Sequence, residues 1–290
     1  MNDVECSFYN KLREQLRERF EYWQYDITDD DVLDFSTYDL AEFIEKNEHF
    51  YLYQYRKPEY YNIRNFEKQR IHLSENGSFN DVYEGLPTDD LKNCSSEDIS
   101  NLYDLASIAC FTETNNNQLM WSHYADSHKG FCVEYDLKLL PKDSLEVCKH
   151  LFPVLYGEKR IIDSNLIELN DELKELREAI NKQYVYDDIE YFNNIIPLFI
   201  AKGTAWAYEK EWRVIYTKKD MYEIDDDVLY SCNIPFSCIS AVYLGYRIDK
   251  EVKENIIEIC RRLSKERNIS VFQEILSDDS YEIKFIECEI

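Results

Sequence analysis

Apolar and polar residues alternate in many short stretches of the chain, and a period of two is typical of β-strands with one buried face. Pro153 removes a backbone donor from one such stretch, so we expect that strand at the edge of a sheet. The same alternation places Phe131, Val133 and Tyr135 on a single face. The predicted strands lie at 50–56, 70–74, 107–114, 131–136, 151–157, 211–217, 228–233, 240–246, 270–276 and 281–289.

A period of three to four apolar positions predicts helices in other parts of the chain, over 3–23, 30–47 and 249–267. The segment 117–130 also predicts a helix, which Gly130 would close with His128 and Lys129 in its last turn. After Pro58 the pattern allows a short helix or a loop.

Residues 163–184 carry a stripe of apolar residues on an otherwise charged helix: Leu166, Leu169, Leu173, Leu176 and Ile180. Two heptads are few for a coiled coil, so we favour a helix packed on its neighbour, with partner binding or self-association through this helix as the alternative. A second helix over 186–207 should kink at Pro197.

These elements predict an α+β fold with a mixed or antiparallel sheet. Residues 1–48 would form N-terminal helices. Residues 49–290 would form one domain with a helical insertion at about 160–207.

Composition narrows the class of protein. With 33 basic and 58 acidic residues the net charge is −25, which repels polyanions and argues against broad binding to a phosphate backbone. The 6 glycines are too dispersed for a glycine-rich nucleotide cradle. The 9 cysteines are odd in number and scattered, which suits a reducing cytosol rather than a disulfide framework or a zinc site. Without a signal-peptide pattern or a membrane-length apolar run, we expect a soluble cytoplasmic protein.

The stretch "AYEKEWRVIY" sets two carboxylates one residue apart at the start of a predicted strand. Alternation places Glu209, Glu211 and Arg213 on the face opposite Trp212, and Arg213 should keep Glu211 ionised. An oriented, ionised carboxylate can accept a ribose hydroxyl and stabilise a developing oxocarbenium ion. A solvated strand edge with charges facing outward fits the same pattern.

Three further segments contain chemically useful side chains. Trp121 and Tyr124 are three apart and should face the core together, while the spacing of His123 and His128 is poor for a metal pair, so we expect no metal there. Thr112 and Thr114 share a strand face and suit either a ligand or a bond across the sheet. The turn at 79–81 offers Asp81, which with Glu84 could in principle bind Mg²⁺.

In their order along the chain, these segments resemble a bacterial family, domain-of-unknown-function family 2971. The resemblance runs over about 50–265. It rests on Tyr53 and Tyr55; Phe79, Asn80 and Asp81; Met120 to Tyr124, His128, Gly130 and Cys132; and Lys202, Trp206, Glu209, Glu211 and Arg213.

A weaker resemblance is to ADP-ribosyltransferases of the DNA-targeting toxin type, whose layout is an arginine strand, a Ser/Thr strand and an E-x-E motif. It implies that NAD is the cosubstrate and that Arg56 pairs with its pyrophosphate. It further implies catalytic roles for Glu211, at the nicotinamide ribose, and Glu209, at the acceptor. The cofactor-binding set would be Tyr53, Tyr55, Thr112, Thr114, Trp121, His123 and Tyr124.

Three functions follow as hypotheses. The first is an NAD-using enzyme that transfers ADP-ribose to a protein or nucleic-acid acceptor or hydrolyses NAD, as a toxin or phage-defence effector. The second is a metal-dependent nuclease or phosphodiesterase, with carboxylates from Asp81, Glu84, Glu113 and Glu134. The third is a non-catalytic sensor that binds a partner through the insertion and the acidic surface.

Overall fold

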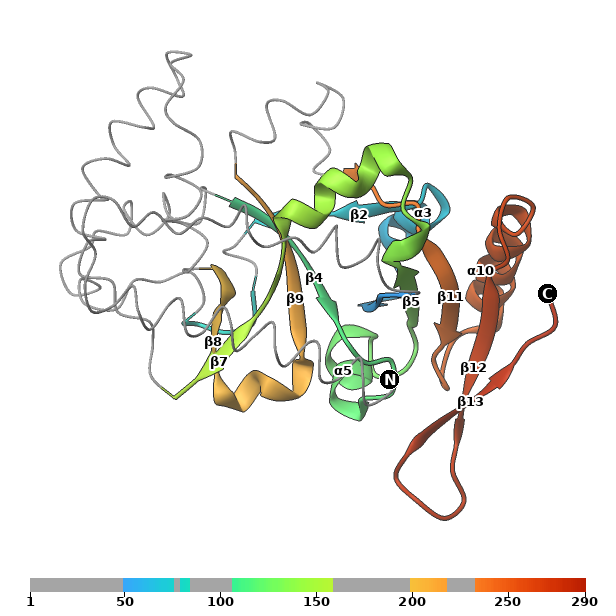
Figure 1. Cartoon of the computed structure of the whole chain (residues 1–290). Helices are drawn as coiled ribbons and strands as arrows, with labels where there is room; N and C mark the ends of the chain where they lie inside the picture. Colours follow the sequence, from blue (N-terminus) through green and yellow to red (C-terminus); the bar gives the residue numbers. More distant parts are fainter. Residues whose placement is uncertain (1–48, 76–78, 84–105, 159–198, 218–232) are drawn as a thin grey trace, which may run out of the picture.

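The computed structural model describes residues 49–75, 79–83, 106–158, 199–217 and 233–290. The described residues form a mixed α+β fold around a nine-stranded sheet, in the order β13-β12-β11-β5-β1-β4-β9-β6, with β3 also paired to β4 (Figure 1). All strand pairs in this sheet are antiparallel except β11 with β12, which are joined by a helix. The predicted fold class is therefore confirmed.

The strands of the large sheet are β1 (Tyr51–Arg56), β3 (Ser74–Glu75), β4 (Ala106–Thr112), β5 (Phe131–Asp136), β6 (Leu151–Pro153), β9 (Glu211–Thr217), β11 (Ile239–Leu244), β12 (Ser270–Leu276) and β13 (Ile283–Glu287). Two small sheets pair β2 (Arg70–His72) with β10 (Asn233–Pro235) and β7 (Leu155–Gly157) with β8 (Ala201–Gly203). β6 ends the large sheet, as the proline in it predicts.

Three α-helices lie in the described residues: α3 (Tyr60–Glu67), α5 (Gln118–Tyr124) and α10 (Lys250–Leu263). Side-chain caps start two of them, since Asn117 accepts from the first backbone amides of α5 and Asp249 from those of α10. Three short 3₁₀ segments accompany them, η3 (Leu137–Leu139), η4 (Lys142–His150) and η5 (Thr204–Glu209).

Each face of the large sheet carries a buried cluster of apolar side chains. One face holds the main apolar core, where Phe131, Val133 and Trp212 pack with residues of α10 such as Ile256 and Ile259. The other face carries a smaller cluster under α5, with Tyr55, Trp121 and Tyr243. Glu211 and Arg213 lie on this second face, because both alternate with Trp212, whereas the buried Arg56 has the parity of Leu52 and bonds to Tyr135 on the first face.

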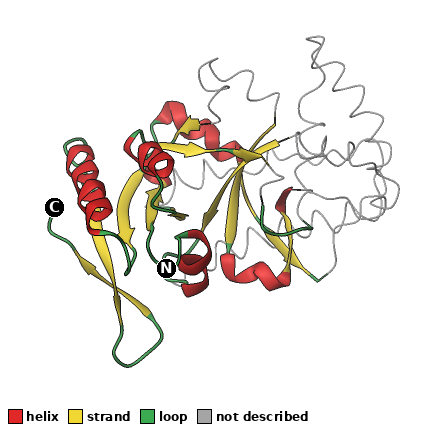
Figure 2. Cartoon of the chain, turned by 180° about the vertical axis from the view of Figure 1, so that it is seen from behind, coloured by secondary structure: helices red, strands yellow, loops and turns green. Residues whose placement is uncertain are grey.

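The large sheet is divided between β1 and β4. β1 pairs with β5 along its whole length, but it pairs with β4 through a single register pair, Tyr53 with Thr112. Past this pair the amide of Gln54 spans the gap and donates to the backbone oxygen of Cys110 at 3.1 Å. The two strands therefore diverge and leave room between them. In both views the β12–β13 hairpin projects away from the body of the molecule (Figures 1 and 2).

The predicted helix over 117–130 is too long. α5 ends at Tyr124, and Asp126, Ser127 and His128 all have positive φ angles of 47°, 55° and 68°. This left-handed turn brings Gly130 against β1, where an added Cβ would lie 2.0 Å from the backbone oxygen of Arg56. His128 and Lys129 are consequently outside the helix.

The predicted helix over 186–207 is wrong in its last part, because β8 and η5 occupy 201–209. The predictions for 1–48, 163–184, 186–198, Glu84 and most of 228–233 lie outside the described residues. No helix in the described ranges has the length and apolar character needed to cross a membrane.

Candidate functional site

A cavity of about 370 Å³ occupies the gap between β1 and β4. Tyr53, Gln54 and Tyr55 of β1 line one wall, and β4 from Ile108 to Thr112 lines the other. At one end lie charged and aromatic side chains of α5, β8, η5 and β9, namely His123, Tyr124, Lys202, Glu209 and Glu211. The predicted E-x-E pair therefore faces a cavity instead of solvent.

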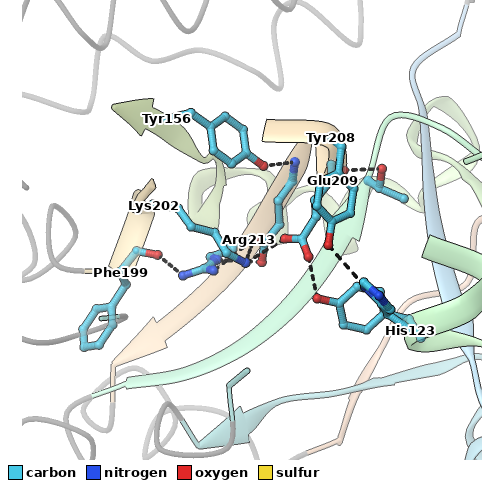
Figure 3. Close-up of polar contacts among 10 residues, drawn as sticks. His123, Tyr156, Phe199, Lys202, Tyr208, Glu209 and Arg213 are labelled. Atoms are coloured by element: carbon cyan, nitrogen blue, oxygen red, sulfur yellow. Dashed lines mark hydrogen bonds and ion pairs between the residues drawn. The ribbon is translucent and has the colours of Figure 1, made fainter. Parts of the chain in front are cut away.

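Lys202 holds the two glutamates together at this end. Its Nζ lies 2.7 Å from Glu209 Oε2 and 3.0 Å from Glu211 Oε2 (Figure 3). The spacing of the two glutamates predicts that Glu209 continues the strand face of Glu211, but Glu209 instead ends η5. Lys210 follows it in a left-handed conformation with a φ of 44°. This reversal lets both carboxylates meet the same ammonium group.

Arg213 fixes the second glutamate. Its Nε and Nη2 donate to the two oxygens of Glu211 at 2.8 and 3.0 Å, and its Nη1 donates to the backbone oxygen of Phe199 at 2.5 Å. Glu209, Glu211 and Arg213 are only 2%, 5% and 1% exposed, and β9 lies between β4 and β6. The alternative of an outward-facing strand edge is therefore wrong.

Among the described residues the cluster sets two carboxylates beside two cations, and such pairing offsets the cost of removing buried charges from water. Burial by itself would raise the pKa of Glu211, but Arg213 and then Lys202 outweigh it and hold that pKa at about 2. Burial, followed by the charge of Glu211, raises the pKa of Glu209, and Lys202 only partly opposes this. Two adjacent carboxylates thus have pKa values pushed in opposite directions.

Hydrogen bonds connect α5 to η5 beside the charged cluster. Tyr124 donates its hydroxyl to Glu209 Oε1 at 2.5 Å, and the His123 ring lies 3.2 Å from the hydroxyl of Tyr208 (Figure 3). Asn117, which caps α5, also donates to the backbone oxygen of Tyr208. Burial, and next the bond to Glu209, raises the pKa of Tyr124, so this hydroxyl stays protonated as a donor.

The predicted cofactor-binding residues divide into two groups. Tyr53, Tyr55, Thr112, His123 and Tyr124 line the cavity. Within this group the Thr112 hydroxyl donates to the backbone oxygen of Glu209, so it bonds across to η5 and positions the glutamate.

Thr114 and Trp121 are in the second group and do not line the cavity. The hydroxyl of Thr114 is bonded to Asn116 beyond the end of β4, which corrects the prediction of a shared strand face with Thr112. Trp121 is fully buried, donates to the backbone oxygen of Asn115 and stacks on His128, so it anchors α5, as predicted for a core residue.

The predicted role of Arg56 at a pyrophosphate is also corrected by its surroundings. Its guanidinium is buried, donates to the Gln54 side-chain oxygen through Nε and Nη2, and reaches the hydroxyl of Tyr135 at 2.5 Å. Its remaining bonds go to backbone oxygens of Asn62 and Arg70. Arg56 does not line the cavity, and it instead orients the Gln54 amide that does.

The carboxylates proposed for a nuclease are not assembled in the described residues. Glu113 accepts from the Trp212 indole at 2.8 Å, whereas Glu134 accepts from Ser240 and Tyr243 on a different pair of strands. No group of three or more His, Cys, Asp or Glu side chains in the described ranges is arranged to hold a metal ion.

The cluster and the helix that contacts it lie in one stretch of sequence, from α5 to β9. Residues 120–214 match the model of a family described as "Protein of unknown function (DUF2971)". The match covers about a third of the chain, and this segment is similar to that family. The match contains Tyr124, Lys202, both glutamates and Arg213, so the charged end of the cavity lies within the segment that is similar to this family. No curated protein and no solved structure matches the chain.

Sequence reasoning missed several cavity residues, among them Lys57, His72 and, as a site residue, Lys202. Lys202 belongs to the DUF2971 pattern, but the irregular backbone between it and Glu209 hides their contact, because neither helical nor strand periodicity relates them. His72 is in a short strand of a separate sheet, and no local pattern places that strand beside β4.

Proposed function

We propose that the protein uses NAD in this cavity, breaking the bond between nicotinamide and ribose and passing the ADP-ribose group to water or to an acceptor. The observation that carries the proposal is the pair of cavity carboxylates whose pKa values are shifted in opposite directions while they share Lys202. Two carboxyl groups with separated pKa values suit two different roles in one reaction.

Glu211 supplies a fixed negative charge in this scheme. Its low pKa keeps it ionised, and Arg213 holds its orientation, so it stabilises the oxocarbenium-like ribose as the nitrogen leaves with the bonding electrons. A preorganised charge in a water-poor site acts more strongly than the same charge in water.

Glu209 acts as the general base. Its raised pKa brings it closer to the range in which a carboxylate takes up a proton effectively, and it receives the proton of the attacking water or acceptor hydroxyl. The products of hydrolysis are then ADP-ribose, nicotinamide and one proton. Tyr124 orients Glu209 through its hydroxyl.

The aromatic wall suits a dinucleotide without a glycine cradle. Tyr53, Tyr55 and Tyr124 contribute aromatic side chains to the lining of the gap, and the chain has only 6 glycines. Protein pockets for ligands of this size have volumes on the order of 300–1,000 Å³.

The test is to incubate the protein with NAD labelled in the ADP-ribose part, with and without cell extract, and to measure free nicotinamide and transferred label. We expect Glu209→Gln and Glu211→Gln each to lower the rate by at least about 100-fold. Glu282→Gln, on the exposed hairpin, is the matched control and should not change it. If the wild-type protein releases no nicotinamide and transfers no label, the proposed function is wrong.

A further inference from the structure

The cavity has a second end that the E-x-E chemistry does not use. Lys57 follows β1, His72 ends β2 and Ser74 begins β3, and all three line the cavity. Ser74 is paired with Ile108, four residues along β4 from Thr112, which lies beside the glutamate cluster. At about 3.4 Å per strand residue the two ends are ~14 Å apart.

At this second end the His72 side chain is held by a neighbouring tyrosine. The His72 ring meets the hydroxyl of Tyr61 through Nδ1 at 2.7 Å, and the two rings pack edge to face at 5.2 Å. Tyr61 belongs to α3, and Lys57 lies just before that helix, so one short segment contributes both the contact to the His72 imidazole and the Lys57 ammonium group.

The local charge of the cavity contrasts with that of the whole protein. At the first end Glu209 and Glu211 form ion pairs with Lys202, and Glu211 also pairs with Arg213. Lys57 adds a positive charge at the second end, where the described part of the chain places no carboxylate in the cavity lining. A chain of net charge −25 thus places a positive charge at the second end of this cavity.

We propose that Lys57, His72 and Ser74 bind the phosphate groups of a nucleotide whose sugar reaches the glutamate cluster. The proposal rests on the proposed function and assigns its diphosphate to these residues, in place of Arg56, whose guanidinium is engaged within the fold. An ammonium group, an imidazole and a hydroxyl are all effective donors to phosphate oxygens. A small neutral ligand would not span the two ends.

The experiment measures binding by calorimetry with ADP, inorganic pyrophosphate and adenosine as probes, on the full-length protein. We expect ADP and pyrophosphate to bind, and Lys57→Gln to weaken both about tenfold, since a charge-assisted hydrogen bond is lost. Lys57→Gln combined with His72→Gln should weaken them further, while Lys57→Arg should largely restore binding. Added salt should weaken ADP binding in wild type.

Lys68→Gln is the matched control, because Lys68 ends the same helical segment, is exposed and does not line the cavity. Its melting temperature and ADP affinity should equal those of wild type. An equal loss of affinity in Lys68→Gln and Lys57→Gln would show attraction to surface charge in general and would overturn the proposal. The absence of ADP and pyrophosphate binding would overturn it as well.

These outcomes separate the two proposals. If ADP binding depends on Lys57 and His72 but NAD is not consumed, the phosphate site stands and the reaction is wrong. If NAD is consumed while Lys57→Gln and the double variant leave both its KM and ADP affinity unchanged, the reaction stands and the phosphate site is wrong. Each variant is included only if its far-UV spectrum and melting temperature match those of wild type.

Discussion

The hydroxyl of Tyr124 lies 2.5 Å from Oε1 of Glu209, although 85 positions separate the two residues in the chain. The bond joins α5 to η5, and both residues line the cavity. Since it stabilises the carboxylate, it opposes the rise in the pKa of Glu209 that burial produces.

Tyr124→Phe removes this hydrogen bond while keeping the ring. We expect the pKa of Glu209 to rise, so the acid limb of the pH–rate profile for nicotinamide release should move to higher pH. A rate loss of about tenfold at neutral pH is expected from one misoriented base. Tyr60→Phe, at a tyrosine that is 80% exposed, serves as the control. An unmoved acid limb in Tyr124→Phe would show that Glu209 does not set it.

Lys202→Met removes the ammonium shared by Glu209 and Glu211 and leaves their charges buried without it. Breaking a buried ion network by removing one partner costs about 3–5 kcal/mol, and we expect this loss in the free energy of unfolding measured with urea. Lys250→Met is the control, because Lys250 pairs with Glu254 at 3.8 Å on the exposed surface of α10. It should change the free energy of unfolding by no more than ~0.5 kcal/mol.

The pKa of about 2 for Glu211 predicts a specific acid dependence of stability. A carboxyl group whose pKa is lower in the folded than in the unfolded protein stabilises the fold above its unfolded pKa. That contribution is lost as pH falls through the folded value. The unfolding free energies of wild type and Glu211→Gln should therefore differ most near neutral pH and converge between about pH 4.5 and pH 2.

The contribution of Glu209 to the pH dependence of stability has the opposite sign, because its pKa is raised in the folded protein. Its ionisation destabilises the fold as pH rises, and Glu209→Gln should remove this loss of stability.

Two glycines provide a matched pair of substitutions. Gly130→Ala places a Cβ 2.0 Å from the backbone oxygen of Arg56, so β1 or the turn must shift, and we expect a loss of about 3 kcal/mol in stability. Gly203→Ala meets no atom within 4 Å at a φ of −66°, and it should be neutral or stabilise by about 0.5 kcal/mol. Thermal unfolding of both variants measures the difference.

The strands were predictable because their periodicity is local. Trp212, Val214 and Tyr216 share one strand face by alternation and do face the main core, and β9 has the predicted bounds of 211–217. The end of α5 was not predictable in the same way. A left-handed turn over residues 126–128 stops the helix early, and its only local signal is Gly130 two residues later.

The pairing of Glu211 with Arg213 was predictable from the side chains on one strand face, but the burial of the cluster was not. Burial depends on Lys202, on the bend at Lys210 and on the neighbouring strands β4 and β6, which long-range contacts bring together. The charge pattern alone predicts that such a segment is exposed, because unpaired charges are rarely buried.

Because β1 and β4 share a single register pair, Tyr53 with Thr112, the large sheet consists of two panels, that is, two groups of well-paired strands that meet at a weakly paired joint. One panel runs from β13 to β1 and the other from β4 to β6, and the cavity lies along the joint. A molecule bound there touches both panels and adds cross-links where the backbone ladder has few. Occupancy of the cavity should then slow amide hydrogen exchange at Tyr55 and Cys110 together, so the joint itself becomes a reporter of the ligand.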